Sequence, residues 1–172
     1  MTTSFCHVRA LVSEDTAGWH SAYDAVARER RFLGLLEAPS QEVLQREVAS
    51  AVAQGHPFFV AESAGSVVGW CSALPYNQDG FRHCAPLQMG VMGPWRGQGW
   101  GARLLEQTLS AARVQGLVRI DLEVYADNHA ALRLYERFGF QLECVKRKQR
   151  FLDGLYTDVA HLGLLLDTAG VS

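Results

Sequence analysis

The segment GVMGPWRGQGWGARLLEQTLSAAR, residues 90–113, joins a glycine-rich stretch to a regular amphipathic pattern, and it constrains the fold more than any other part of the chain. Gly97, Gly99 and Gly101 alternate directly after Arg96. The positions that follow and repeat at helical spacing are Leu104, Leu105, Thr108, Leu109 and Ala112. The repeat predicts a helix whose first N–H groups lack partners within the helix. Because a helix N-terminus carries about half a positive charge, the segment predicts an anion site.

More than one interpretation fits such a loop. Gly97-x-Gly99-x-x-Ala102 also satisfies the dinucleotide fingerprint G-x-G-x-x-G/A, which would indicate an NAD-type oxidoreductase. Against it, residues 94–96 separate the preceding strand from the first glycine. Asp121 and Glu123 also lie within a strand instead of at its end. A plain strand-to-helix turn, in which the glycines only supply positive φ, is the other alternative.

Composition limits the function classes. A chain of 172 residues is the size of one domain, so a single domain over residues 1–172 is expected. The net charge of −2 argues against nucleic-acid binding. No basic leader and no apolar run of membrane-spanning length is present, which predicts a protein that neither enters nor crosses a membrane. The four cysteines form no C-x-x-C pair, which is typical of reduced, mostly buried thiols in the cytoplasm.

The remaining patterns alternate between strands and helices. The expected helices cover residues 13–36, a segment from an N-cap at Ser40 to about Gly55, and a short segment from an N-cap at Asn128 to a C-cap at Gly139. The expected strands lie at residues 5–12, in a hairpin over 57–76 with its turn at 63–65, at 86–92, at 116–128 and in a closing hairpin over 141–166. The order predicts an α/β (α+β) fold with a mixed sheet.

Two motifs in this order resemble those of the GNAT superfamily of acyl-CoA-dependent N-acyltransferases. The phosphate motif Q/R-x-x-G-x-G/A corresponds to RGQGWG, which begins at Arg96. The next motif, a strand followed by an asparagine, a helical tyrosine and a closing G-F, corresponds to LEVYADN, Asn128, Tyr135 and Gly139-Phe140. The resemblance extends over about residues 5 to 166. It implies the GNAT fold, a central, mostly antiparallel sheet of about seven strands flanked by about four helices.

The resemblance assigns positions to the cofactor. It implies that the backbone of Met89 and Val91 pairs with the pantetheine arm, that Asn128 bonds the pantetheine, and that Gly90 begins a bulge. The implied pyrophosphate site consists of Arg96, Gly97, Gln98, Gly99, Trp100, Gly101 and Ala102. Two positions depart from the usual pattern, which has a smaller aliphatic residue at Trp100 and a polar one at Gly93.

Acyl transfer to an amine needs an acid for the departing thiolate and a route for the amine proton. Tyr135 follows Asn128 by two helical turns on the same face, and the resemblance implies that it is the general acid and touches the cofactor. A tyrosine that only packs in the core is the alternative. Glu123 and Glu37 are the candidates for a base or an anchor of the substrate amine. Adjacent His83 and Cys84 suggest a cysteine nucleophile only weakly.

The histidines show no metal-ligand spacing, so no metal is expected. We therefore expect a cytoplasmic enzyme that transfers the acetyl group of acetyl-CoA directly to a primary amine of a small molecule or amino acid. A protein N-terminal or lysine acetyltransferase and a non-catalytic acyl-CoA sensor are the alternatives. The family resemblance also implies a homodimer.

Overall fold

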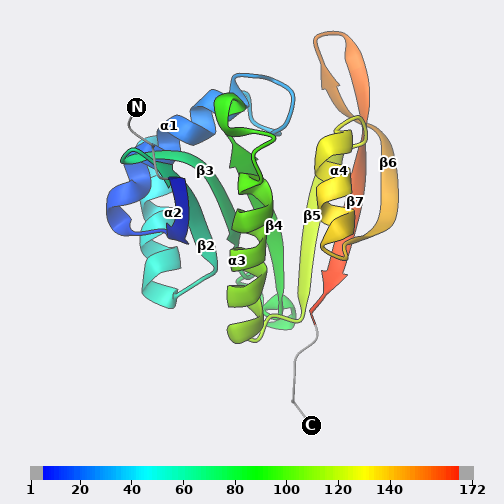
Figure 1. Cartoon of the computed structure of the whole chain (residues 1–172). Coiled ribbons are helices and arrows are strands. Elements are labelled where there is room, and N and C mark those ends of the chain that lie inside the picture. Colours follow the sequence, from blue (N-terminus) through cyan, green and yellow to red (C-terminus); the bar gives the residue numbers. More distant parts are fainter. Residues whose placement is uncertain (1–5, 167–172) are drawn as a thin grey trace. The chain divides into compact units, whose positions relative to one another are not determined.

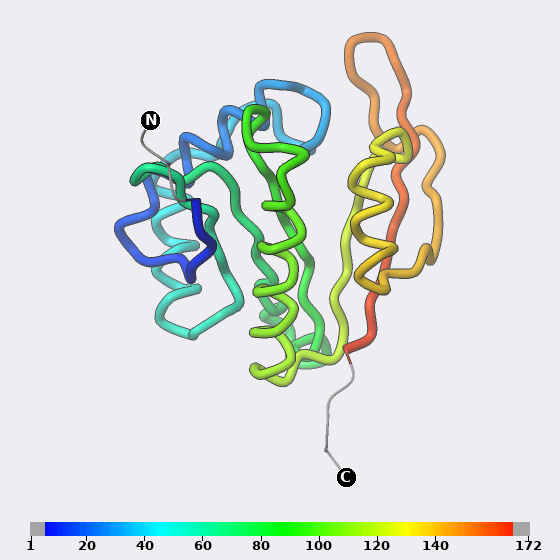
Figure 2. Tube along the Cα trace, in the orientation of Figure 1, coloured from blue at the N-terminus to red at the C-terminus, as the bar shows by residue number. Residues whose placement is uncertain are grey.

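The computed structural model describes residues 6–166, and these form two compact units. The first unit runs to Leu74 and resumes over Gln88–Gln115; the second joins Pro75–Leu87 to the chain from Gly116 onward. Figure 1 shows the helices and strands, and Figure 2 follows the chain through them. Strand β4 (Cys84–Val91) begins in the second unit and ends in the first. The expectation of a single domain stays a prediction.

Seven strands form one mixed sheet in the order β1-β2-β3-β4-β5-β7-β6. In the first unit, β1 (Cys6–Ala10), β2 (Phe58–Ser63) and β3 (Ser66–Ala73) pair antiparallel. In the second unit, β5 (Arg119–Tyr125), β7 (Leu155–Leu165) and β6 (Gln141–Leu152) pair antiparallel. The parallel ladder joins residues 84–86 of β4 to residues 119–121 of β5. The predicted mixed, mostly antiparallel sheet is confirmed.

The helices of the first unit cover its strands. They are α1 (Thr16–Ala27), α2 (Gln41–Gln54) and α3 (Trp100–Val114), with short 3-10 turns η1 (Ser13–Asp15) and η3 (Gly93–Trp95). Helix α3 packs against β2 and β3, and α1 packs against β3 and α2. The buried residues of α3 are those that the helical repeat predicted: Leu104, Leu105, Thr108, Leu109 and Ala112. Burying this apolar stripe stabilises the helix where intrinsic propensity alone would not.

The first unit has an aromatic cluster beside the end of β4. Trp70 stacks on Tyr23 of α1 with ring centroids 5.2 Å apart, and both rings belong to or pack against the main apolar cluster. A Cβ built on Gly90 would lie 2.4 Å from Cη2 of Trp70. Glycine at residue 90 is therefore what lets the Trp70 ring lie against β4.

Helix α1 is shorter than predicted. The periodicity favoured a helix to residue 36, but α1 ends at Ala27, and residues 28–37 form mostly turns and bends. Arg30 has a φ of 60°, which no α-helix contains. The Asp24 carboxylate accepts Nε–H of Arg28 at 2.5 Å and the backbone N–H of Ala38 at 3.0 Å. These contacts fold the chain back, so a tertiary hydrogen bond overrides the local pattern.

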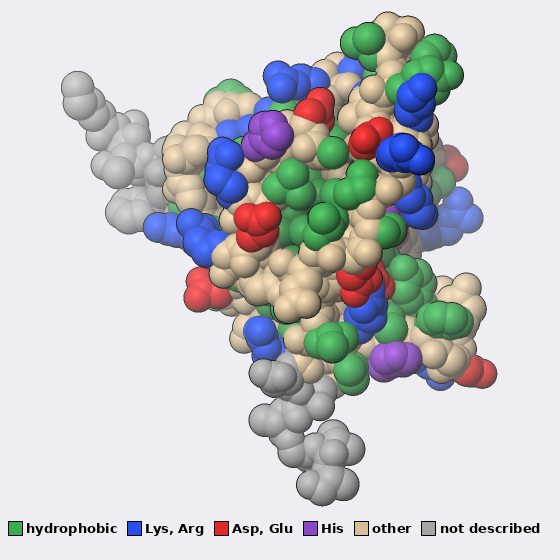
Figure 3. Space-filling view, turned by 90° about the vertical axis from the view of Figure 1, so that its right-hand side faces the viewer, with side chains coloured by type: hydrophobic (Ala, Val, Ile, Leu, Met, Phe, Trp, Pro, Cys, Tyr) green, Lys and Arg blue, Asp and Glu red, His purple; other side chains and the backbone are tan. Residues whose placement is uncertain are grey.

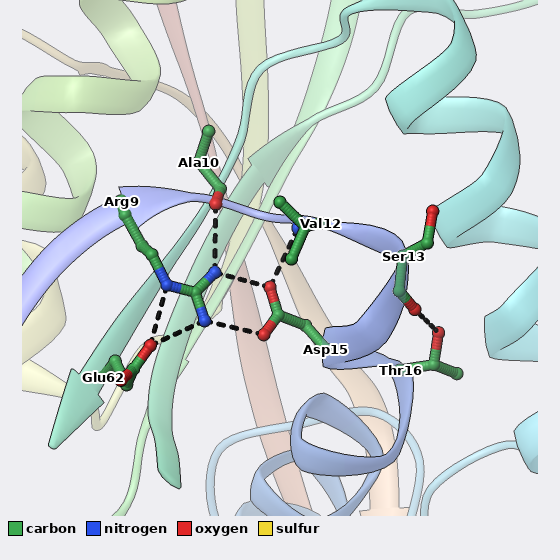
Figure 4. A network of polar contacts seen from close by, with 7 residues as sticks. All are labelled: Arg9, Ala10, Val12, Ser13, Asp15, Thr16 and Glu62. Carbon is green, nitrogen blue, oxygen red and sulfur yellow. Dashed lines mark hydrogen bonds and ion pairs between the residues drawn. The ribbon is translucent and has the colours of Figure 1, made fainter. Parts of the chain in front are cut away.

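An ion-pair network fixes the entry to α1 in the first unit (Figure 4). Arg9 on β1 donates to both carboxylate oxygens of Asp15, at 2.6 and 2.8 Å, and its Nε–H donates to Glu62 on β2 at 2.8 Å. Asp15 also accepts the backbone N–H of Val12 at 2.8 Å and is only 8% exposed. The network ties two strands to the turn that precedes the helix.

The second unit contains α4 (His129–Arg137), the 3-10 turn η2 (Asp79–Phe81) and the hairpin of β6 and β7. The predicted closing hairpin is confirmed, with its turn at Asp153 and Gly154. Helix α4 ends at Arg137 and its C-cap is Phe138, one residue before the predicted Gly139, which follows in the left-handed region at φ 90°. Within residues 6–166, no helix is long and apolar enough to span a membrane.

Candidate functional site: a glycine loop at the start of α3

Residues 96–102, called the glycine loop below, form an open helix start in the first unit. Gly97 and Gly99 have φ values of 72° and 85°, in the left-handed region that other residues rarely adopt. Gly99 is the N-cap of α3 and supplies no capping side chain, and the first turn contains no acidic residue. A Cβ built on either glycine would meet no atom within 4 Å. The loop therefore presents backbone N–H groups beside open space, which suits a phosphate.

Hydrogen bonds within the chain give the glycine loop its shape. The backbone N–H of Trp95 donates to the Met92 carbonyl at 3.0 Å, which closes η3. The Gln98 side chain donates to the Pro94 carbonyl at 2.8 Å. Gln98, which the family resemblance placed at the pyrophosphate, thus stabilises the turn through its side chain, while its backbone remains part of the loop.

Arg96 contacts protein groups of the first unit. Its Nε–H donates to the Val91 carbonyl at 2.7 Å, and Nη1 and Nη2 donate to the two carboxylate oxygens of Glu29 at 2.7 and 2.6 Å. The guanidinium lies 4.5 Å from the centroid of the Phe32 ring. The role of Arg96 in phosphate binding stays a prediction, and Glu29 and Phe32 are contacts that no sequence pattern indicated.

Other predicted cofactor positions lie near the loop in the first unit. Val91 is buried at the end of β4, and Met89 is half-buried two residues earlier. The Trp100 ring is half-buried, and the Arg103 guanidinium lies 4.6 Å from its centroid. Gly101 and Ala102 form the first turn of α3. The first unit thus brings together the predicted positions from Met89 to Ala102.

The second unit holds Asn128 and Tyr135. Oδ1 of Asn128 accepts the backbone N–H of Ala131 at 3.3 Å, which confirms the predicted N-cap of α4. The cap engages the oxygen of the amide, so the amide nitrogen is the half that can donate to a ligand. Tyr135 is 7% exposed and lies edge to face with Phe140 at 5.6 Å. Its packing fits either a core role or a shielded acid.

Glu123 occupies the polar face of β5, opposite buried Leu122 and Val124, as predicted. It is 59% exposed, and its carboxylate lies 3.5 Å from Nδ1 of His161, its partner in the register of β5 and β7. Nε2 of His161 in turn contacts Oε1 of Gln149 at 3.2 Å. Glu123 is therefore accessible and has an imidazole beside it.

Tyr76 is a further phenol of the second unit that could serve as the acid, and sequence reasoning missed it. Desolvation raises the pKa of Tyr76, the carboxylates of Asp121 and Glu123 raise it further, and the guanidinium of Arg119 lowers it. Its ring contacts that of Phe81 edge to face, at 6.4 Å. Tyr76 precedes a loop without a regular pattern, so no local signal in the sequence connected it with the carboxylates of β5.

Two earlier candidates lie in settings that do not favour catalysis by themselves. Glu37 is 72% exposed and forms an ion pair with Arg28 at 3.6 Å. Cys84 is buried, and desolvation is the main reason that its pKa is raised, so its thiolate is disfavoured. Among the described residues no group of three or more His, Cys, Asp or Glu side chains could hold a metal ion.

Comparison with known proteins agrees with these features. Residues 19–140 match the model of the acetyltransferase (GNAT) family. The L-methionine sulfoximine/L-methionine sulfone acetyltransferase of Pseudomonas aeruginosa is 32% identical over 118 residues, which span 66% of this chain and 67% of that protein. The L-amino acid N-acyltransferase MnaT of Escherichia coli is 29% identical over 114 residues, 66% of each chain.

Solved structures share the fold. A GNAT-family acetyltransferase from Streptococcus pneumoniae superposes with a TM-score of 0.87 at 22% identity, over 94% of this chain and 99% of that one. The yncA protein of Salmonella typhimurium, solved with acetyl-CoA, gives the same TM-score and identity over 96% of both chains. Because the range that matches the family model includes both the glycine loop and the Asn128 cap, this chain belongs to the GNAT acetyltransferase family.

Proposed function

We propose that this acyl-CoA-dependent enzyme transfers the acetyl group of acetyl-CoA directly to the primary amine of an amino acid or of a similarly small molecule. The observation that carries the proposal is the glycine loop. Its two left-handed glycines leave open space before the uncapped start of α3. An arrangement of this kind binds phosphate oxygens without needing a charged side chain.

The donor site would be built largely from backbone. The N–H groups of residues 97–102 would hold the pyrophosphate, and the backbone of Met89 and Val91 would pair with the pantetheine. The family resemblance also assigns a role in donor binding to Asn128, whose amide nitrogen would be the donating group. Bound acetyl-CoA supplies an activated acyl carbon as a thioester, so the protein has to orient the donor, deprotonate the amine and protonate the thiolate.

Two side chains of the second unit are proposed for the proton transfers. The Tyr135 hydroxyl would donate a proton to the sulfur, because a buried phenol is shielded from competing water. The Glu123 carboxylate would accept the amine proton, directly or through water, because it is 59% exposed. Glu37 would serve as an anchor for the substrate amine, since its carboxylate is exposed.

Direct transfer is favoured over an acyl-cysteine intermediate. A cysteine nucleophile needs an accessible thiolate with a low pKa. Burial raises the pKa of Cys71 to about 12. Cys84 is also buried, with its pKa raised chiefly by desolvation. Both thiols are buried, so neither offers the accessible thiolate that a nucleophile needs.

The acceptor class rests on the relatives. The Pseudomonas protein is named for L-methionine sulfoximine and L-methionine sulfone, and the Escherichia coli protein for L-amino acids. We propose that this chain likewise takes a free amino acid or a close analogue. The test is release of CoA thiol from acetyl-CoA with a panel of amino acids, both named sulfur analogues, and peptides with a free N-terminus or an internal lysine.

Turnover with a free amino acid or analogue at least tenfold above that with peptides is the expected result, because a site that hydrogen-bonds the polar groups of its substrate rejects analogues that leave those groups unpaired. Faster turnover of the peptides would replace the proposal by a protein acetyltransferase. Acetyl-CoA binding without turnover of any amine would instead indicate an acyl-CoA sensor.

We also propose a cytoplasmic homodimer. All four thiols are unpaired, as in a reducing compartment. In the second unit, β6 is the last strand of the order, and large apolar side chains of its hairpin are more than half exposed: Leu142, Phe151, Leu155, Tyr156 and Leu165. Figure 3 shows hydrophobic side chains gathered on the face that carries this hairpin. Light scattering after size-exclusion chromatography tests this: a mass near twice 19.0 kDa is expected, and a monomer would refute it.

A further inference from the structure

The Arg96 side chain crosses from the glycine loop to two other parts of the first unit. Its backbone begins the loop, its Nε–H donates to the carbonyl of Val91 at the end of β4, and its two terminal nitrogens bind Glu29. Glu29 lies two residues after the end of α1. One side chain therefore connects the end of β4, the glycine loop and the segment that follows α1.

The hydrogen bond from the Arg96 side chain to the Val91 carbonyl closes a ring that contains residues 91–96. Residues 91–96 contain η3, whose own hydrogen bonds run from Trp95 to Met92 and from Arg96 to Gly93. The Nε–H bond of 2.7 Å adds a side-chain link across the same span. It fixes the distance between the end of β4 and the first residue of the glycine loop, which are the two backbone segments proposed to contact the donor.

Glu29 determines how the guanidinium is oriented. A bidentate pair fixes the plane of both groups as well as their separation. With the Nε–H on Val91 and one N–H of each terminal nitrogen on Glu29, three of about five guanidinium donors are engaged. The Phe32 ring lies 4.5 Å from the guanidinium carbon and holds its face. The side chains of Arg96 and Glu29 are 33% and 32% exposed, so the pair is partly shielded from water.

We propose that the Arg96 side chain stabilises the conformation of the donor site and does not bind the phosphates, a role called the brace below. Glu29 is the positioning residue that holds the Arg96 side chain in place. The inference rests on the proposed function, because it concerns binding of acetyl-CoA by the same loop. It adds a residue far away in the sequence to the determinants of donor affinity. Glu29 acts through Arg96 and has no contact of its own with the donor.

The two possible roles of Arg96 predict opposite effects on acetyl-CoA affinity when the charge of Glu29 is removed. If Arg96 bound phosphate, Glu29 would compete with the donor for the same fork, and removing its negative charge would tighten binding of the polyanionic acetyl-CoA. If Arg96 is a brace, removing the carboxylate loosens the loop, and binding weakens although a negative charge has been lost. The direction of the change in the dissociation constant therefore decides between the two roles.

The experiment measures acetyl-CoA affinity by titration calorimetry for wild type, Glu29→Gln, Arg96→Lys and the double variant. Glu29→Gln keeps the shape of the side chain, and Arg96→Lys keeps the charge but loses the fork. Glu106→Gln is the matched control, because it removes the same charge from an exposed position farther along α3. Melting curves without ligand establish that each variant is folded.

We expect the dissociation constant of acetyl-CoA to rise about tenfold in each single variant, because the loop then holds its contacts with the donor in the wrong place. The double variant should show no further rise, because both changes remove the same interaction. The KM for acetyl-CoA should rise in parallel while kcat stays within about twofold, because the brace affects binding and not the chemical groups. Glu106→Gln should stay within about twofold of wild type, as an exposed charge does.

Three outcomes would overturn the inference: unchanged affinity in Glu29→Gln, tighter binding in Glu29→Gln, or effects of the two single variants that multiply in the double variant. Tighter binding would return Arg96 to the phosphates, and multiplying effects would mean that Glu29 acts independently of it. Failure of wild type to bind acetyl-CoA would be a different result, since it would refute the proposed function itself.

Discussion

At the scale of single residues, Asp15 is a buried carboxylate of the first unit that is held by several hydrogen bonds. Burial alone would raise the pKa of Asp15, but the hydrogen bonds from Arg9 and from the backbone of Val12 outweigh burial, and the pKa is lowered. The pKa of Arg9 is raised, chiefly by its hydrogen bond to Asp15. The two shifts have the same meaning: folding favours the charged pair.

Asp15→Asn should therefore destabilise the protein in a pH-dependent way. We expect a loss of about 2 kcal/mol at pH 7, because the variant leaves Arg9 without its main partner. The contribution of the carboxylate is complete above its unfolded-state pKa of about 3.9 and disappears as the pH falls through the lower folded-state pKa. Urea unfolding of wild type and variant from pH 7 to pH 3 measures this.

Asp79→Asn is the control for that experiment, because Asp79 is 90% exposed and pairs with Arg82 on the surface. Its free energy of unfolding should change by less than about 1 kcal/mol, as surface pairs do. A difference between Asp15→Asn and wild type that stays constant down to pH 3 would contradict the assigned role of the carboxylate.

Tyr135→Phe tests the proposed acid. The phenyl ring preserves the contact with Phe140, whereas the proton donor is lost. We expect kcat to fall by about tenfold or more, as for a lost general acid, with the dissociation constant of acetyl-CoA nearly unchanged. Steady-state kinetics and calorimetry on the same preparation measure both quantities. Unchanged kcat would leave Tyr135 as a core residue and make Tyr76 the next phenol to examine.

At the scale of elements, predictions from sequence held where one local interaction decides the structure. The stripe of α3, the caps at Ser40 and Asn128 and the closing hairpin each depend on residues a few positions apart, and each is confirmed. The end of α1 was missed because the bond between Asp24 and Ala38 spans the turn that replaces the last helical residues. The pairing of Glu29 with Arg96 was missed because residues so far apart in the sequence leave no pattern.

The glycine loop yields a prediction at this scale, for the variant Gly99→Glu. A glutamate at a φ of 85° is strained, and its carboxylate would stand where the pyrophosphate is proposed to bind. Gly116→Glu is the matched control: it lies just beyond the other end of α3, has a φ of 82° and likewise faces open space. Both variants should lose about 1 kcal/mol of stability from backbone strain.

The two glycine variants should differ in ligand binding alone. Acetyl-CoA affinity should fall by about a hundredfold or more in Gly99→Glu, because a favourable backbone contact with the pyrophosphate is replaced by like-charge repulsion. In Gly116→Glu it should stay within about twofold of wild type, because an exposed distant charge is screened. Calorimetry at one ionic strength compares them. Equal affinities in the two variants would show that the glycine loop does not bind the pyrophosphate.

At the scale of the whole molecule, the order of the motifs predicted the strand arrangement of the sheet better than the residue pattern of any single strand did. Strand β6 is exposed along most of its length, so no alternation of buried and exposed residues marks it as a strand. Its place in the sheet follows from its hairpin with β7. Strand β4 contributes to both units, and no periodicity in eight residues can reveal that. The family resemblance predicted a sheet of about seven strands, and the seven-stranded sheet with its match to the Streptococcus pneumoniae structure confirms that prediction.

The last prediction concerns the ligand that the folded chain binds as a whole. A ligand present at about 100 times its dissociation constant stabilises the native state by about 2.7 kcal/mol, which raises the Tm by about 5 to 10 °C for a chain of this length. We expect this shift with acetyl-CoA and with CoA, and no shift with NAD. The glycine spacing also fits a dinucleotide, so NAD is the discriminating control. A shift with NAD alone would mean that the family fold has been retained while the loop has changed its ligand, and the proposed acetyl transfer would be refuted.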